Sequence, residues 1–279
     1  MQSWHAQLTP FRATPFGVEV RGMRGGAGPP ALLLHGTAGS WRGFDAWLPV
    51  LLPRAELVIP DLPGFGQSPP PALRPRVRTW ARLMHALATE LAASPRILVG
   101  LGMGASVAMA YLQVAPPAAV AALTHVVLHT PAYYPGAVRP AFRWGVRVAT
   151  TPPVFAVLQR LLSRPDLLDW YVRHVVQGPD VPEEDVRLLS EDFRRASLPV
   201  LRGIARDMVR ADFRPTLRGL ATPTLAIAAE NDPFVYPAEI EKLERLLPRA
   251  RVVVQPNVGH GWTAEAIAEQ RRELARFLD

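Results

Sequence analysis

The sequence predicts an α/β protein with a mostly parallel, doubly wound sheet and an inserted helical segment. Short, continuously apolar runs such as residues 31–34 and 97–99 are typical of parallel strands that are covered on both faces. Segments with helical spacing alternate with these runs along most of the chain. Between residues 132 and 220 the alternation stops, and five amphipathic helical patterns follow one another.

These patterns divide the chain into two expected parts. We expect residues 1–131 and 221–279 to form the α/β core and residues 132–220 to form a helical cap. The 279 residues, 49% of them hydrophobic, are enough for a sizeable core. No apolar run reaches the roughly 18 residues that a membrane span needs, and the first residues lack the pattern of a signal peptide. We therefore expect a cytoplasmic protein without a membrane span.

The composition excludes several kinds of chemistry. The absence of cysteine excludes disulfides, thiolate catalysis and cysteine-ligated metal sites. The net charge of +7 raises the question of nucleic-acid binding, but the basic residues are spread along the chain without a cluster interleaved with aromatics. We expect a small-molecule ligand and no nucleic acid, metal or cofactor. The oligomeric state is left open.

A glycine-rich turn after the strand at residues 97–99 has the clearest local signal. The segment Gly100-Leu101-Gly102-Met103-Gly104 lies between this strand and a helix of small residues. The chain must reverse there within about four residues, which predicts a tight strand-turn-helix elbow.

Polar residues also follow the other predicted strands. His35-Gly36 and the segment from Asp61 to Ser68 come after the first two buried strands, and Asp232-Pro233 and Gly259-His260 come after the last two. The carboxyl ends of parallel strands meet at one edge of an open α/β sheet, where ligands bind. We expect these residues to surround a common crevice.

The order of these motifs resembles the α/β-hydrolase-fold superfamily, in particular its cap-bearing esterase, C–C hydrolase and haloperoxidase-like branch. That family carries its nucleophile in a Gly-x-Ser-x-Gly elbow, and Gly102 stands here in place of the serine. The resemblance implies that His260 is the catalytic histidine and that Asp232 orients it. It also implies that the backbone amides of Thr37 and Met103 form an oxyanion hole.

Each of these residues also has a simpler interpretation. His260 is equally consistent with a loop histidine that bonds to backbone, and Asp232 with a turn before Pro233. His35 and His129 fit supporting or core positions better than direct catalysis. Ser106 lies one helical turn beyond Gly102, where a small residue most often serves packing. For the segment from Asp61 to Ser68 we expect a structural turn.

Three functions remain compatible with a glycine at position 102, and the sequence favours an enzyme. In the first, His260 and Asp232 act as a general-base dyad on a small, mainly apolar carbonyl or ester substrate without a covalent intermediate. In the second, the chain is a pseudo-hydrolase that binds a ligand or a partner. In the third, it is a serine-dependent esterase inactivated by substitution at 102.

The expected cap suggests what the substrate is like. Its aromatic and aliphatic residues suit a mainly apolar ligand, with Arg143 or Arg173 available for a carboxylate. The residues in question are Phe142, Trp144, Phe155, Leu161, Trp170, Tyr171 and Phe213.

Overall fold

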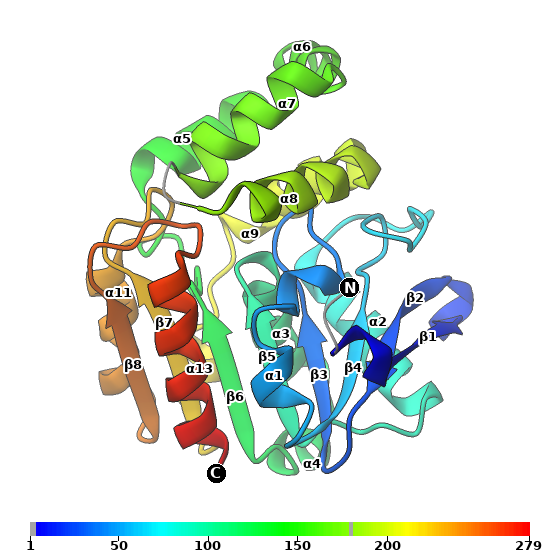
Figure 1. The fold of residues 1–279 in the computed structure, drawn as a ribbon, viewed down its shortest axis with the longest axis vertical. Coiled ribbons are helices and arrows are strands. Elements are labelled where there is room, and N and C mark those ends of the chain that lie inside the picture. The colour runs from blue at the N-terminus through cyan, green and yellow to red at the C-terminus, as the bar shows by residue number, and fades with distance from the viewer. Residues whose placement is uncertain (1–3, 179–180) are drawn as a thin grey trace.

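An eight-stranded sheet forms the centre of the molecule and confirms the predicted mostly parallel α/β architecture (Figure 1). The structure is a computed structural model that describes residues 4–178 and 181–279. The strand order is β1-β2-β4-β3-β5-β6-β7-β8, with β1 and β2 antiparallel to their neighbours and the other pairs parallel. The strands are β1 (Leu8–Ala13), β2 (Val20–Gly25), β3 (Pro30–Leu34), β4 (Glu56–Pro60), β5 (Ile97–Leu101), β6 (His125–His129), β7 (Thr224–Ala229) and β8 (Ala250–Gln255).

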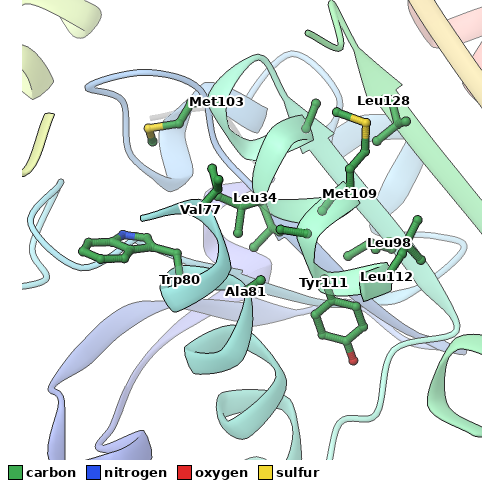
Figure 2. Close-up of a cluster of buried hydrophobic side chains, with 14 of the residues drawn as sticks. Leu34, Val77, Trp80, Ala81, Leu98, Met103, Met109, Tyr111, Leu112 and Leu128 are labelled. Carbon is green, nitrogen blue, oxygen red and sulfur yellow. The ribbon is translucent and has the colours of Figure 1, made fainter. Parts of the chain in front are cut away.

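Helices cover both faces of this sheet, which explains the continuously apolar strands. Successive side chains of a strand point to opposite faces. Leu34 therefore packs with α2 and α3 in one core, part of which is shown in Figure 2, while Leu33 packs with α1 and α13 in the other. The helices that flank the sheet or connect its strands are α1 (Leu48–Leu51), α2 (Val77–Glu90), α3 (Met103–Val114), α4 (Pro117–Ala121), α11 (Pro237–Glu241), α12 (Leu243–Leu246) and α13 (Ala264–Leu278).

The N-terminal edge of the sheet differs from the sequence-based expectation. The alternation of residues 15–22 in the sequence predicts an edge strand there, but the edge strand is β1, and β2 lies between β1 and β4. Phe16 and Gly17 have φ angles of 52° and 76°, which interrupt an extended backbone. In β1 only the first and last residues are buried, so its sequence shows no clear alternation, and Pro10 is tolerated because the strand is at an edge.

A helical layer lies between β6 and β7 in the chain and above the carboxyl ends of the central strands (Figure 1). The five amphipathic patterns each correspond to one of its helices, and four of these helices carry proline in the first turn, where a missing N–H costs nothing. We call the elements α5 to α9 the helical layer. They are α5 (Pro140–Ala149), α6 (Pro152–Leu162), α7 (Pro165–Tyr171), the π-helical turn η4 (Val172–Gln177), α8 (Glu183–Arg195) and α9 (Leu198–Met208), and α10 (Arg214–Leu217) leads back to the sheet.

The structure describes most residues of the expected core and of the expected cap. Residues 1–3 of the core and 179–180 of the cap lie outside the described residues. The boundaries at 131 and 221 stay a prediction. Within the described part of the chain, none of the helices has the length and apolar character needed to cross a membrane.

A buried ion pair fixes α8 to the loop after β3. Asp192 accepts a hydrogen bond of 2.6 Å from the Ser40 hydroxyl and pairs with the Arg42 guanidinium, which also bonds Glu191 at 3.1 Å. Burial by itself would lower the pKa of Arg42, but the hydrogen bonds and negative charges of Asp192 and Glu191 together outweigh it, so this pKa is raised. This end of the helical layer is therefore tied to the core through charged groups that are largely removed from water.

We expect Asp192→Asn to lower the free energy of unfolding by about 1–3 kcal/mol, because it leaves Arg42 beside an uncharged partner in a largely buried place. Asp169→Asn is the matched control, because Asp169 and its partner Arg194 are 49% and 40% exposed. Loss of an exposed pair costs at most about 1 kcal/mol. Urea unfolding of both variants measures the difference, and equal losses would contradict the role given to Asp192.

Candidate active site

The elbow between β5 and α3 is built from three glycines, of which the outer two are required by packing. A Cβ atom on Gly104 would lie 1.9 Å from the carbonyl oxygen of Leu34, and one on Gly100 would lie 2.5 Å from Cα of Ala105. Both neighbours are backbone atoms that cannot turn away. These glycines let α3 pack directly against β3 and β5.

The central glycine is different, because the space beside it is open. Gly102 precedes α3 with φ 49° and ψ −104°, and its amide donates to the carbonyl of His129 at 2.9 Å. For a Cβ built at Gly102, the nearest heavy atom outside the adjoining residues is Thr130 Oγ1, at 4.0 Å. The turn thus has the strained geometry of an elbow and room for a side chain that the sequence does not supply.

Asp232 and His260 form a hydrogen-bonded pair after two neighbouring strands of the sheet. Asp232 follows β7, His260 follows β8, and Nδ1 of His260 lies 2.8 Å from Oδ2 of Asp232. The other oxygen of Asp232 accepts the amides of Phe234 and Val235 at 2.7 and 2.9 Å. Asp232 therefore makes the turn expected before Pro233 and also orients the histidine.

The environment of Asp232 keeps it ionised. The residue is only 1% exposed, and burial alone would raise its pKa. The charge of His260 and its hydrogen bond, together with the two amides, outweigh burial and hold the pKa of Asp232 below its ordinary value. An ionised carboxylate at Nδ1 leaves Nε2 of His260 as the nitrogen available to the cavity.

A cavity of about 990 Å³ brings the candidate residues together between the sheet and the helical layer. Thr37, Gly102, Met103 and His260 all line it. The amide of Met103 is the first of α3 and so has no acceptor within that helix. Much of the apolar part of the wall comes from the helical layer, including Phe142, Val146, Phe155, Leu158, Leu201 and Met208.

This arrangement of elbow, acid and histidine agrees with the comparison to known families. Residues 29–262 match the family described as alpha/beta hydrolase fold. The chain belongs to the alpha/beta hydrolase fold family.

Relatives of this chain include lipases and esterases. Lipase 3 of Moraxella sp. (strain TA144) is 24% identical over 258 residues, which are 90% of this chain and 78% of the lipase. Pimeloyl-[acyl-carrier protein] methyl ester esterase of Nitrosomonas europaea is 26% identical over 238 residues, 84% of this chain and 90% of the esterase. The crystal structure of a bromoperoxidase from Bacillus anthracis matches with a TM-score of 0.82 at 22% identity, over 97% of this chain and 99% of that chain. At this identity the bromoperoxidase shows a shared fold alone.

The two histidines predicted to be in supporting positions, His35 and His129, are both buried, and their hydrogen-bond partners differ. His35 donates from Nδ1 to the carbonyl of Gly36 at 2.8 Å and accepts the amide of Leu62 at Nε2 at 2.9 Å. Burial is the main cause that lowers its pKa. His35 thus joins the loops after β3 and β4, and among the described residues it is not part of the cavity wall.

His129 does line the cavity, at the end of β6. Its Nε2 accepts the indole N–H of Trp262 at 3.0 Å, and the ring lies at edge-to-face angles to Trp47 and Trp262. Burial, with a smaller effect from the charge of His260, lowers the pKa of His129 to about 3. The ring is therefore neutral near pH 7.

Two further polar positions have structural roles. Ser106 is fully buried one turn into α3, away from the described cavity wall, and its hydroxyl has no hydrogen-bond partner among the described residues. Asp61 accepts the amides of Trp41 and Gln67, each at 2.8 Å. Gly66 approaches the Asp61 carboxylate so closely that a Cβ would lie 2.4 Å from it. The segment from Asp61 to Ser68 is the expected turn.

The expected substrate-facing residues of the helical layer divide into two groups. Phe142, Phe155 and Tyr171 line the cavity. Trp144 and Trp170 are 59% and 57% exposed and point to solvent instead. Leu161 is also exposed, and Phe213 is buried outside the described cavity wall. The predicted Arg143 and Arg173 are not among the residues that line the described cavity. The arginines that do line it are Arg42, Arg202 and Arg271.

The cavity residues that the sequence analysis missed include Thr130. Thr130 follows β6, lines the cavity and is 2% exposed. Its φ of 44° is unusual for a β-branched residue, and nothing in the local sequence indicates it, because the residue before a proline normally has an extended conformation.

We expect Gly104→Ala to lower the free energy of unfolding by about 3 kcal/mol or more, because the added Cβ meets backbone that cannot yield. Gly102→Ala has room, so its cost is limited to backbone strain of about 1–2 kcal/mol. Gly145→Ala on α5, where nothing lies within 4 Å, is the control and should be neutral or slightly stabilising. Urea unfolding ranks the three variants, and a Gly104→Ala no worse than Gly102→Ala would refute the packing argument.

The low pKa of His129 makes stability depend on pH. The unfolded chain binds a proton at this histidine below about pH 6.5, and the folded chain does so only near pH 3. The free energy of unfolding should therefore fall as the pH drops from 6.5 toward 4, by up to about 1.4 kcal/mol per pH unit from this group. In His129→Gln, urea unfolding should show a smaller decrease in the free energy of unfolding over the same pH range. If the free energies of the variant and the native chain decrease in parallel, His129 is not responsible.

Proposed function

We propose that this chain is an esterase-like hydrolase in which His260 and Asp232 activate a water molecule, without a covalent intermediate on the protein. The observation that carries the proposal is that His260 and the open volume at Gly102 face one cavity. The proposal is supported by two features of this cavity, a histidine oriented by a buried carboxylate and a glycine at 102 that leaves room for a water.

The proposed reaction starts with a water in that volume. Nε2 of His260 takes a proton from the water as its oxygen forms a bond to the substrate carbonyl carbon. The carbonyl electrons move to oxygen, and the amides of Met103 and Thr37 donate hydrogen bonds to the resulting oxyanion. When the tetrahedral intermediate collapses, the ester C–O bond breaks and the leaving alkoxide takes the proton back from His260. At no step does a group of the substrate become attached to the protein, and His260 returns to its neutral form.

The protein supplies its main electrostatic contribution through Asp232. As His260 gains a proton, the ionised carboxylate 2.8 Å from Nδ1 stabilises the imidazolium, and the amides of Phe234 and Val235 keep that carboxylate in place. Phe234 also packs edge-to-face on the imidazole, with ring centroids 4.7 Å apart. The base is thus fixed in both rotation and tautomer.

The cavity and the relatives support an ester with an apolar acyl chain as substrate. The wall provided by the helical layer is mostly aliphatic and aromatic, and the volume of about 990 Å³ is large for a small-molecule site. The relatives are named as lipases and as a methyl ester esterase, which are both ester hydrolases. We propose that the helical layer acts as a cap that binds the acyl chain while the carbonyl lies above Gly102.

We expect His260→Ala to reduce the hydrolysis of short- and medium-chain nitrophenyl esters by about 10²–10⁴-fold, because the general base is lost. The control is His174→Ala, which removes an exposed histidine of the helical layer outside the described cavity wall. Steady-state rates of the two variants and the native chain test the dyad. Unchanged turnover in His260→Ala would refute it.

Gly102→Ser separates the proposal from the two alternatives. A serine restores the side chain of the family's elbow, so this variant should form a covalent adduct with a fluorophosphonate, while the native chain should form none. If the native chain does not hydrolyse esters and Gly102→Ser hydrolyses them strongly, the result favours a serine hydrolase inactivated at 102. If both are inert and an alkyl ligand raises the Tm, the chain is a binding protein.

A further inference from the structure

We propose that the Thr130 hydroxyl holds the attacking water by donating its hydrogen into the open volume at Gly102. We further propose that a hydrogen-bond chain from Trp262 through His129 orients this hydroxyl. The inference rests on the water-based hydrolysis proposed above and names the group that would position the water.

The position of Thr130 is the first observation. Its side chain lies in the cavity wall, and its Oγ1 is the nearest heavy atom to a Cβ built at Gly102, 4.0 Å away. Hydrogen bonds between hydroxyl oxygens span about 2.5–3.0 Å, so an oxygen in the open volume comes within reach of Thr130. The family's serine would place its own oxygen in the same region.

The direction of the hydrogen bonds follows from Trp262. An indole N–H can only donate, so Nε2 of His129 must accept at 3.0 Å and carries no proton. In a neutral imidazole the proton is then on Nδ1, which lies 3.4 Å from Thr130 Oγ1. His129 thus donates to one lone pair of the threonine oxygen and leaves the threonine hydrogen free. Since His129 is the one side chain bonded to this hydroxyl in the described part of the chain, that hydrogen is available to the cavity.

The backbone of Thr130 is the second observation. Its φ of 44° is in the left-handed region, and of the non-glycine residues with positive φ that the structure describes it is the one β-branched residue. The residue is held there by its amide, which donates to the carbonyl of Ile227 at 2.7 Å. Such outliers persist where the surroundings enforce them and are found most often at functional sites. Here the strain places a hydroxyl at the cavity wall.

The proposed geometry suits a water that must attack. The water accepts one hydrogen bond from Thr130, donates one hydrogen to Nε2 of His260 and keeps a lone pair for the carbonyl carbon. The threonine gains and loses no proton in this step, because the proton of the water goes to His260 and then to the leaving alkoxide. A serine at position 102 would fill the volume with its own oxygen and replace this water as the attacking group in the first step, while a water would still be needed later to hydrolyse the acyl-enzyme.

A comparison of two substitutions in two backgrounds tests the proposal. In the native background Thr130→Val, which keeps the shape and β-branching but removes the hydroxyl, should lower kcat for nitrophenyl esters by about tenfold or more and leave KM within about twofold. Thr130→Ser should retain kcat within about threefold. In the Gly102→Ser background Thr130→Val should change the rate of the nitrophenol burst, which reports acylation of the serine, by less than about threefold, because the serine oxygen and not a water attacks in that step. Equal losses in both backgrounds would overturn the proposal and make Thr130 a structural residue.

Crystal structures of the native chain and Thr130→Val provide a measurement that does not depend on turnover. We expect a water within hydrogen-bond distance of both Thr130 Oγ1 and His260 Nε2 in the native chain, and its loss in the variant with the backbone unchanged. If the valine variant does not fold, Thr130→Ala replaces it. A native site without this water overturns the inference. A water at this place in a chain without ester turnover supports the water site and refutes the proposed function alone.

Discussion

The close contact between α3 and β3 determines the rest of the site. Gly104 approaches the carbonyl oxygen of Leu34 to a distance that leaves no place for a Cβ, so the helix begins directly against the sheet. The chain has to leave β5 through a sharp turn to reach that position, and Gly102 takes up the unusual dihedral angles of the turn. Met103, the first residue of α3, then lies in the cavity wall.

The other site residues come to the same place because of strand direction. Strands β3, β5, β6, β7 and β8 are parallel, so the residues that follow them meet at one edge of the sheet. Thr37, Thr130, Asp232 and His260 come from four different loops, which follow β3, β6, β7 and β8. Gly102 lies on a fifth loop, after β5, so the residue at this position and the other four loops belong to separate parts of the chain.

The sequence was sufficient to predict the parallel strands of the sheet and the helical layer, because buried parallel strands and helical spacing leave strong periodic signals. It also predicted the pair of Asp232 and His260, because each follows a predicted strand in the order of the family's motifs. It was not sufficient for β1, where an edge strand with Pro10 buries only its two end residues and shows no alternation. It also missed Thr130, because a left-handed threonine before proline contradicts local preference and is enforced by tertiary contacts. The side-chain directions of Trp144 and Trp170 depend on how the helices pack together, which amphipathic patterns alone do not specify.

The helical layer is anchored unequally, and this has a consequence for selectivity. Its α8 side is tied to the core through Asp192, whereas α6 contains no buried residue although Phe155 and Leu158 face the cavity. Elements with few buried contacts open at low free energy. The floor of the cavity is therefore held more firmly than the wall formed by α6. If the proposed ester hydrolysis takes place on this floor, we expect strict selection for the reacting group and loose selection for the length of the acyl chain.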